Sequence, residues 1–584
     1  MEQKLTGYPS IDKPWLKYYS EETKNAKVPE FTVYENIYKN NVNHTDKVAL
    51  IYFGNKIKYS YLFEQVENTK RALVALGVKK DDRVVLYTSS TPEALYVILA
   101  LCRIGATANM INPLFASEQA RDRINETEAE VMVVLDQLYG KIEEVLPQTC
   151  VKTAIVIPVY ASMSGITKVV ATYKMKKKLK YNEHLISWNR FLSRGDKNIS
   201  VPDAVYEKDR PLVMVYSSGT TGASKAIVLT NDGINSIIFH YLSPEFPYEE
   251  VERFLQIIPI WFSTGIVLSV LTPVCLGVAT VLEPVFSKEN FARDIKKYRP
   301  NMTLATTGLW LYASKSKDLK NMDLSFLMYP VEGGEQVIPR VEIGMNQFFK
   351  EHNCNAAWLK GYGMCELGST VATDSASVHK IGATGFPIAG VTVAAFDTET
   401  DEEKRYNERG EIRVLSPCRM KEYYKNPEAT ENFFYKDAEG NLWGRTGDIG
   451  YVDEDGFIFI LGRSNDVFTG ENGQQYYCFD IENVILENEN IAQCEVVGLS
   501  KGTYEVPVAH IVLEDGCALS EKEIVESIHA NCIKKLPREC VPCGYKLCGA
   551  FPVKNSGKRD MELIRKDKEN FVLPQDGEMR NISF

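Results

Sequence analysis

A run of small hydroxyl and glycine residues that ends in a lysine is the part of this sequence best suited to chemistry. It reads Ser217-Ser218-Gly219-Thr220-Thr221-Gly222-Ala223-Ser224-Lys225. Glycines allow the backbone to approach an anion closely, and amides and hydroxyls donate hydrogen bonds to phosphate oxygens. Lys225 adds a compact positive charge. The run therefore predicts a phosphate-binding loop.

An apolar stretch from Leu212 to Tyr216 leads directly into this loop and is typical of a β-strand. The loop does not have the spacing G-x-x-x-x-G-K-[ST], so it is not a Walker-type P-loop. A flexible polar loop is the alternative interpretation. Because an unselected run of this kind would seldom follow a strand directly, its position favours phosphate binding.

This loop resembles the phosphate loop of the acyl-adenylate-forming superfamily, which includes acyl-CoA synthetases, firefly luciferases and peptide-synthetase adenylation domains. Further motifs of that superfamily follow in the expected order, so the resemblance extends over about residues 30 to 565. It implies that ATP and Mg²⁺ are bound and that Thr220 and Lys225 take part in catalysis. The other loop residues that would hold the nucleotide are Ser217, Ser218, Gly219, Thr221 and Gly222.

A second motif, Gly361-Tyr362-Gly363-Met364-Cys365-Glu366, resembles the Y-G-x-T-E segment of the superfamily. The resemblance implies that Tyr362 stacks on adenine and that Gly363 and Cys365 lie against the nucleotide. It also makes Glu366 the metal ligand, and a carboxylate is a hard oxygen ligand that suits Mg²⁺ beside a triphosphate. Cys365 replaces a threonine whose hydroxyl donates to the α-phosphate, and a thiol is a weaker donor.

Further segments complete the nucleotide site that the resemblance implies. Gly333-Gly334-Glu335 resembles the glycine turn along adenine, and Trp443 to Asp448 resembles the T-G-D motif, in which Asp448 binds the ribose hydroxyls. Arg463 would contact ribose or phosphate, as a permanently charged group with several donors can. A lone Thr-Gly-Asp is more often a turn, but its position before a hairpin and Arg463 favours the nucleotide interpretation.

The C-terminal part carries the groups that the resemblance connects with movement. Phe551 to Arg559 resembles the closing P-x-x-x-x-G-K element, in which Lys558 is the catalytic lysine that reaches the carboxylate and α-phosphate oxygens. A cation there offsets charge that develops in the transition state. Asn465 takes the place of the usual Asp or Lys hinge, and asparagine tolerates unusual backbone angles. The loop from Val467 to Glu482 is one residue longer than usual.

The resemblance implies a reaction in two steps. The substrate carboxylate attacks the α-phosphorus of Mg·ATP and pyrophosphate leaves; the small domain then rotates about Asn465 and admits a thiol that attacks the acyl adenylate. The thiol is that of coenzyme A in the first interpretation and the phosphopantetheine arm of a carrier protein in the second. A catalytically weak acyl- or nucleotide-binding protein is the third, because of Cys365, Asn465 and the lengthened loop.

The segment from Ile258 to Gly265 corresponds to P-L-x-H-x-x-G, with a phenylalanine in place of the histidine. No aspartate occurs between Val251 and Leu282 to pair with an amino-acid substrate, and a buried, unpaired ammonium group would be costly. We therefore expect a small-molecule carboxylic acid with an apolar tail, aliphatic or aromatic. The predicted pocket residues are Trp261, Phe262, Thr264, Gly265 and Thr307; the alternative is that the aromatic ones are plain core.

The elements that must position these residues follow from the apolar pattern. Short apolar runs alternate with helical patterns between about residues 48 and 420, which predicts a mainly parallel sheet covered by helices. Expected strands are 48–53, 83–87, 131–135, 153–158, 495–499 and 508–513, and expected helices are 61–76 and 94–104. The predicted fold is α/β, with a large N-terminal adenylation domain (1–464) and a small mobile α+β C-terminal domain (465–584).

The composition limits the setting of the protein. Of 584 residues, 45% are hydrophobic and 25% are charged, which is ordinary for a globular chain, and the net charge of −10 argues against a nucleic-acid partner. The N-terminus lacks the apolar run of a secretory signal, so thirteen cysteines indicate reduced thiols and a cytoplasmic protein. The apolar stretch 266–282 is expected to be a buried helix–strand pair rather than a membrane span.

Two features remain outside this scheme. Residues 163–181 (MSGITKVVATYKMKKKLKY) are basic with interspersed apolar side chains. They form either a solvated surface segment or a peripheral membrane contact. Cys532, Cys540, Cys543 and Cys548 contain a single C-x-x-C, so we expect ordinary buried cysteines, with a zinc site as the alternative.

Overall fold

The computed structural model describes residues 5–195, 201–217, 224–243, 245–246, 248–284, 287–514, 516–552, 560–567 and 569–574. The chain forms two compact units. The large unit consists of Met1–Thr446 and Tyr451–Ile460, and the small unit consists of Gly447–Gly450 and Leu461–Phe584.

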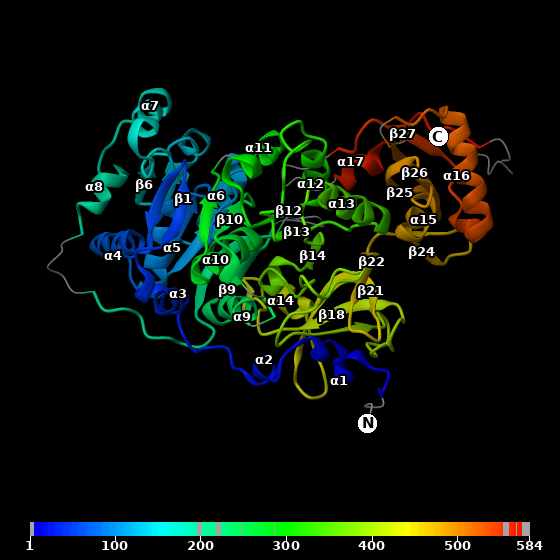
Figure 1. Ribbon diagram of the computed structural model, residues 1–584, viewed down its shortest axis with the longest axis horizontal. Helices are drawn as coiled ribbons and strands as arrows, with labels where there is room; N and C mark the ends of the chain where they lie inside the picture. Colours follow the sequence, from blue (N-terminus) through cyan, green and yellow to red (C-terminus); the bar gives the residue numbers. More distant parts are fainter. Residues whose placement is uncertain are drawn as a thin grey trace. The chain divides into compact units, whose positions relative to one another are not determined.

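The large unit is built on two sheets of mainly parallel strands (Figure 1). The first sheet has the order β16 (Phe386–Pro387), β15 (Ala372–Thr373), β14 (Leu359–Tyr362), β13 (Tyr329–Gly333), β12 (Met302–Ala305), β10 (Arg253–Gln256), β11 (Ala279–Leu282), β1 (Val48–Tyr52) and β2 (Asn55–Lys58). The second has the order β19 (Glu422–Tyr423), β9 (Ala226–Thr230), β8 (Pro211–Tyr216), β4 (Thr107–Met110), β3 (Arg83–Tyr87), β5 (Val131–Leu135), β6 (Thr153–Ile157) and β7 (Leu185–Ser187).

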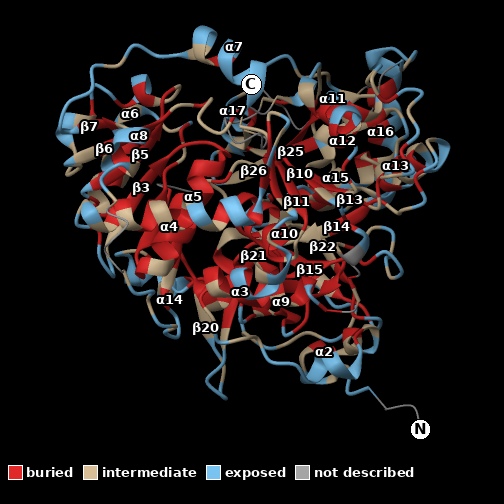
Figure 2. Ribbon diagram, turned by 60° about the vertical axis from the view of Figure 1, so that its left-hand side comes forward, coloured by how far each residue is buried: buried red, intermediate tan, exposed pale blue. Residues whose placement is uncertain are grey.

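Helices cover these sheets in layers, and the sides that face the strands are buried (Figure 2). The helices α11 (Lys288–Tyr298), α12 (Thr307–Ser314) and α13 (Pro339–Glu351) share a core with β10, β11 and β12. The helix α6 (Ser117–Glu126) packs on β3, β5 and β6. A further core joins both sheets to α3 (Val33–Asn41), α4 (Tyr59–Ala75), α5 (Pro92–Ile104) and α9 (Asn231–Tyr241).

The sequence around α5 shows how local chemistry fixes an element. The Thr91 hydroxyl accepts a hydrogen bond from the Ala94 amide, and Pro92 occupies the first turn, where a missing N–H is harmless. Gly105 ends the helix with a φ of 82°, a left-handed conformation that glycine adopts without strain. The expected helix 94–104 therefore begins two residues earlier, at the cap.

An antiparallel sheet completes this part of the chain. Its order is β17 (Thr392–Phe396), β18 (Gly410–Leu415), β21 (Leu442–Val452) and β20 (Phe434–Lys436), and β22 (Ile458–Arg463) pairs with β21. Both β21 and β22 contain residues that belong to each of the two units.

The small unit has its own core around a sheet of β25 (Ile491–Lys501), β26 (Tyr504–Leu513) and β27 (Tyr545–Cys548). The helices α15 (Cys478–Ile485) and α16 (Glu521–Lys535) pack on it, and β23 (Val467–Thr469) forms a hairpin with β24 (Gln475–Tyr477). Cys532 and Cys540 are buried, whereas Cys543 and Cys548 are half-buried. Among the described residues, no group of three His, Cys, Asp or Glu side chains is placed to hold a metal.

The predicted α/β fold with a large and a small part is confirmed, and each expected strand and helix is present with shifts of a few residues. The apolar stretch 266–282 forms a π-helix (Thr264–Leu271), then α10 (Thr272–Cys275) and β11, as the helix–strand interpretation predicted. In the described part of the chain, every helix is too short or too polar to cross a bilayer. A domain boundary at residues 464 and 465 stays a prediction.

Candidate active site

The predicted phosphate loop lies between β8 and β9, which pair antiparallel from Pro211↔Thr230 to Tyr216↔Ala226. Ser218, Gly219, Thr220, Thr221 and Gly222 lie outside the described residues. The described ends of the run are joined to each other. The Ser217 amide donates to the Lys225 carbonyl at 3.0 Å, and the Lys225 amide donates to the Ser217 hydroxyl at 3.0 Å. Ser224 Oγ donates to the Ser217 carbonyl at 2.6 Å, so the base of the loop is closed.

Lys225 and Glu366, which the sequence predicts to serve the same triphosphate, are connected through Tyr423. Lys225 Nζ lies 5.0 Å from the centre of the Tyr423 ring, within the range of a cation–π contact. The Tyr423 hydroxyl donates to Glu366 Oε1 at 2.9 Å. Burial is the largest cause that raises the pKa of Tyr423, and the Glu366 carboxylate adds to it. The hydroxyl therefore stays protonated and donates its hydrogen bond to Glu366.

The sheet register explains why Tyr423 lies there. Its strand β19 pairs with β9 at Tyr423↔Ile227, two residues beyond Lys225. The Met420 amide donates to the Glu366 carbonyl at 2.7 Å, which ties the approach to β19 to the Glu366 segment. Tyr423 could not be predicted from the sequence, because only the pairing of two distant strands brings it next to Lys225 and Glu366.

Cys365 and the segment before the π-helix meet at buried hydroxyls. Ser263 Oγ donates to Cys365 Sγ at 3.1 Å, and Ser369 Oγ donates to Thr264 Oγ1 at 3.3 Å. Ser263 and Ser369 were not predicted; Ser263 lies within the segment 258–265, and Ser369 lies three residues after Glu366. Close backbone approach requires glycine here, since a Cβ at Gly265 would lie 2.0 Å from the Pro259 carbonyl oxygen. A Cβ at Gly363 would lie 1.9 Å from the Ser369 carbonyl oxygen.

The predicted adenine turn follows β13. Gly334 has a φ of 98°, and Glu335 Oε2 accepts from the Gly308 amide at 3.1 Å. Glu332 lies just before the turn, and its Oε1 accepts a hydrogen bond from the Thr307 hydroxyl at 3.0 Å. Burial raises the pKa of the Glu332 carboxyl to about 8, so this group is largely protonated at neutral pH. Tyr362, at the end of β14, is half-buried against the core shared by the two sheets.

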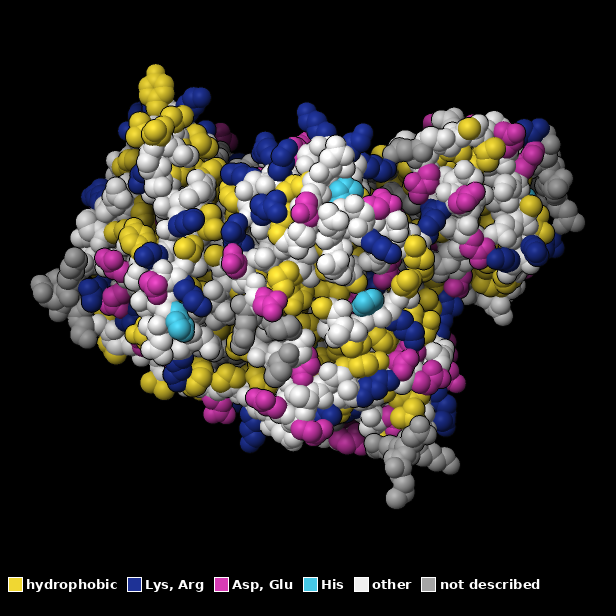
Figure 3. Space-filling view, viewed as in Figure 1, with side chains coloured by type: hydrophobic (Ala, Val, Ile, Leu, Met, Phe, Trp, Pro, Cys, Tyr) yellow, Lys and Arg dark blue, Asp and Glu magenta, His cyan; other side chains and the backbone are white. Residues whose placement is uncertain are grey.

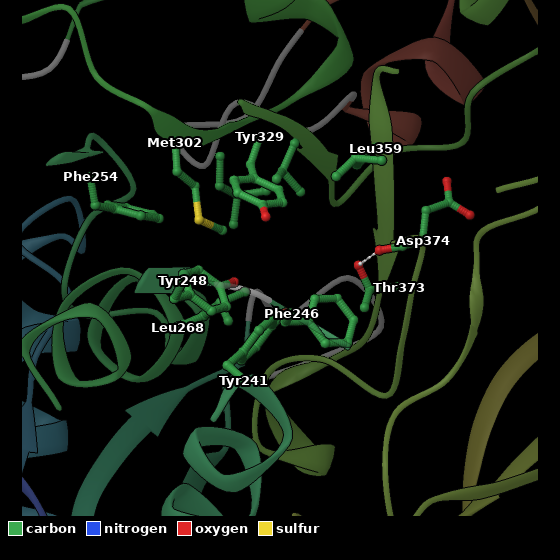
Figure 4. Close-up of a pocket in the computed structure, with 12 residues that line it drawn as sticks. Tyr241, Phe246, Tyr248, Phe254, Leu268, Met302, Tyr329, Leu359, Thr373 and Asp374 are labelled. Atoms are coloured by element: carbon green, nitrogen blue, oxygen red, sulfur yellow. Dashed lines mark hydrogen bonds between the residues drawn. The ribbon is translucent and has the colours of Figure 1, made fainter. Parts of the chain in front are cut away.

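An apolar cavity lies on one face of the first sheet (Figure 4). Its lining is mostly aromatic and aliphatic: Tyr241, Phe246, Tyr248, Phe254, Leu268, Met302, Leu304, Tyr329, Val331, Leu359, Thr373 and Asp374. The rings of Tyr248 and Tyr329 are stacked, with centres 5.9 Å apart. Trp261, Phe262, Thr264, Gly265 and Thr307 are not among the lining residues; Leu268, one turn along the helix that Thr264 begins, is.

Two strands carry both cavity residues and glycines of the nucleotide motifs. Side chains two residues apart in a strand share a face, so Val331 and Gly333 face the same side of β13. The same relation holds for Leu359 and Gly361 on β14. A Cβ on Gly333 would meet Leu304, a cavity residue, at 3.4 Å, which places this glycine at the cavity end of the turn. These glycines therefore follow cavity residues toward the carboxyl ends of parallel strands, where open α/β sheets bind ligands.

The small unit contains the other predicted groups. Arg463 Nη1 donates to Asp448 Oδ1 at 2.6 Å, and the Ser464 amide donates to the Gly447 carbonyl at 2.8 Å. Asn465 is exposed in the turn between β22 and β23 and is not among the residues with positive φ. The longer loop after it forms the β23–β24 hairpin. Lys558 lies outside the described residues.

Comparison with known families decides the identity of this arrangement. The family described as AMP-binding enzyme matches residues 37–424, and the AMP-binding enzyme C-terminal domain matches residues 480–558. The chain belongs to the family of AMP-binding enzymes. The resemblance to acyl-adenylate-forming enzymes is thereby confirmed.

Named relatives of this AMP-binding enzyme extend over nearly the whole chain. It is 26% identical to the "Probable 4-coumarate--CoA ligase 1" of Dictyostelium discoideum over 567 residues, 96% of this chain and 98% of the relative. It is 24% identical to the "Long-chain-fatty-acid--CoA ligase" of Bacillus subtilis (strain 168) over 568 residues, 96% and 99% of the two chains. A crystal structure of the anthranilate CoA ligase AuaEII in complex with anthranoyl-AMP has the same fold, with a TM-score of 0.77 at 20% identity over 93% and 98%.

Proposed function

We propose that this AMP-binding enzyme activates an apolar carboxylic acid as acyl-AMP and transfers the acyl group to the thiol of coenzyme A. The observation that carries the proposal is the Lys225–Tyr423–Glu366 cluster, which lies in the same unit as the apolar cavity. The names of the 4-coumarate and long-chain fatty-acid relatives support the same reaction on apolar acids.

For adenylation, the phosphate loop from Ser217 to Gly222 holds the triphosphate, with Thr220 and Lys225 stabilising the negative charge that moves to pyrophosphate. Glu366 fits a magnesium site because it is a buried carboxylate already oriented by the Tyr423 hydroxyl. When bound, Mg²⁺ neutralises phosphate charge. No protein nucleophile is needed, since the substrate carboxylate attacks the α-phosphorus itself.

The other predicted groups would hold the nucleoside. Tyr362 and the turn Gly334–Glu335 receive adenine, and Asp448 and Arg463 receive ribose and phosphate. The small domain, with its boundary at residues 464 and 465, rotates about Asn465 between the two steps, bringing Lys558 to the acid and later withdrawing it. Coenzyme A then supplies the thiol. A reducing, cytoplasmic setting would keep the protein's thirteen cysteines as thiols.

The apolar lining of the cavity favours an acid with an apolar body, aliphatic or aryl. Asp374 is the acidic residue of the lining, and its Oδ2 lies 3.2 Å from Lys360 Nζ, so its charge is already engaged. Figure 4 shows the Asp374 carboxylate directed away from the aromatic side chains. An α-ammonium group would therefore lack a counter-charge in the cavity, which disfavours amino-acid substrates.

The test is AMP release from ATP, measured with a panel of aliphatic and aryl acids in the presence and absence of coenzyme A. We expect release that requires both the acid and coenzyme A. Replacing Val331 by Phe should reduce activity with the larger acids and leave ATP binding unchanged, because the new ring fills the cavity beside Gly333. Transfer only to a carrier-protein phosphopantetheine would contradict the coenzyme A assignment. Absence of release with any acid would favour a binding protein.

A further inference from the structure

The helix α7 (Gly165–Met175) presents an apolar face to solvent. Ile166, Val169, Val170 and Tyr173 are 84%, 69%, 46% and 91% exposed. Their spacing of three and four residues places them on one side of the helix. Single exposed apolar residues are common on protein surfaces, whereas a contiguous set marks an interaction site.

The opposite side of α7 is packed against the large unit. Ala171 is buried, and Met175 contacts the core shared by the two sheets. Because the inner side is already satisfied by these residues, the outward apolar face cannot be explained as part of the core. An ordinary surface helix buries its apolar stripe and exposes its polar one.

Hydrogen bonds hold the helix and the turn before it in place. The Gln137 side chain donates to the Met175 carbonyl at 2.9 Å, at the C-terminal end of α7. Before its N-terminal end, Ser162 Oγ donates to the buried Glu93 carboxyl at 2.6 Å, and Asn55 donates to the Ser162 carbonyl at 2.8 Å. The apolar face is therefore presented by an anchored element.

Positive charge surrounds this face. The lysines of the segment are exposed: Lys168, Lys174, Lys176, Lys177, Lys178 and Lys180. Residues 163–181 contain no Asp or Glu, although the whole chain has a net charge of −10. Figure 3 shows hydrophobic side chains over α7 with Lys and Arg side chains beside them. A partner of this surface must be apolar and anionic at once.

We propose that α7 and the lysines that follow it bind the surface of a lipid bilayer that contains anionic lipids. The aliphatic side chains and the tyrosine would enter the boundary between headgroups and acyl chains, while the lysines contact anionic headgroups with their stems along the apolar surface. An acidic protein would match the positive charge of the lysines, but it would not account for the exposed aliphatic side chains of α7. This inference does not depend on which acid the enzyme activates.

The experiment is co-sedimentation with vesicles of phosphatidylcholine alone and of phosphatidylcholine with phosphatidylserine. We expect binding to the mixed vesicles, weak binding to the neutral ones, and loss of binding at high salt. The triple variant Lys176→Gln/Lys177→Gln/Lys178→Gln should partition roughly 100-fold less, since each lysine near an anionic surface contributes about fivefold. The variant Ile166→Ser/Val169→Ser/Tyr173→Ser should lose roughly tenfold or more with all lysines retained.

Matched controls test whether vesicle binding depends on α7 and its lysines rather than on exposed lysines or apolar residues in general. Lys208→Gln/Lys317→Gln/Lys436→Gln removes three exposed lysines elsewhere, and Val205→Ser removes a valine that is 80% exposed. Both controls should bind vesicles as the unaltered protein does, and AMP formation without vesicles should be the same for all variants. Failure of the unaltered protein to bind mixed vesicles would overturn the proposal. So would equal binding by the α7 variants and the controls, or binding of α7 to an acidic carrier protein only.

Discussion

The two units of the molecule differ in how their functional groups are held. In the large unit, Lys225, Tyr423 and Glu366 contact one another, and Gly265 and Gly363 allow backbone contacts that a side chain would prevent. In the small unit, Arg463 is half-exposed and pairs with Asp448, next to the exposed turn at Asn465. The difference suggests that the large unit is organised for binding before ligands arrive, while the small unit contributes groups that change partners during the reaction.

Replacing Lys558 by Ala should have the largest effect and should separate the two steps. Acid-dependent ATP–pyrophosphate exchange should fall by about 10²–10³-fold, since a cation that offsets transition-state charge is lost. Thioester formation from supplied acyl-AMP should be largely spared. Lys554→Ala, four residues earlier, is the matched control and should change neither rate. Equal loss of both half-reactions in the Lys558 variant would contradict the division of labour between the units.

Replacing Tyr423 by Phe tests the organisation of the large unit. The change removes the hydrogen bond to Glu366 and leaves a ring for Lys225, so kcat/KM for Mg·ATP should fall by roughly 10–100-fold. The loss should be smaller at high Mg²⁺ concentration. Tyr424→Phe, at the adjacent position, is the control. If the two variants behaved alike, Tyr423 would have no positioning role.

Replacing Gly265 by Ala tests whether the large unit depends on close backbone contact. The added Cβ would lie 2.0 Å from the Pro259 carbonyl oxygen, so unfolding free energy should fall by roughly 1–3 kcal/mol. Gly344→Ala, at an exposed position of α13 with nothing within 4 Å, should be neutral or stabilising. Denaturant unfolding compares the two, and an unchanged midpoint for Gly265→Ala would contradict the contact.

Glu332 gives a pH dependence of stability that belongs to the large unit. Its pKa is raised to about 8 in the folded state from 4.5, so folding takes up a proton between these values. Stability should therefore decline as pH rises from about 5 to 8 and level off above that. Glu332→Gln cannot ionise and should lack this component, whereas Glu335→Gln should keep a smaller one, because the Glu335 charge helps to raise the pKa of Glu332. Thermal unfolding at pH 6 and pH 9 measures the difference; parallel changes in all three proteins would exclude it.

Much of the fold followed from the sequence, because apolar runs and caps are local signals. The strand 83–87 was predicted with its observed bounds, and the expected α5 helix lacked only its first two residues, Pro92 and Glu93. Tyr423 and Ser263 could not be found in this way, since their roles depend on which distant strands and segments meet. An apolar pocket at 261–265 and Thr307 stays a prediction; the apolar cavity of the structure is lined mainly by the first sheet, with Leu268 from the π-helix.

Acid-dependent ATP–pyrophosphate exchange by the unaltered enzyme, without coenzyme A, tests the central claim most directly. An enzyme that forms acyl-AMP should return label from pyrophosphate into ATP only when Mg²⁺ and an apolar acid are both present. Exchange that ignores the acid, or cleavage of ATP to ADP and phosphate, would contradict the account.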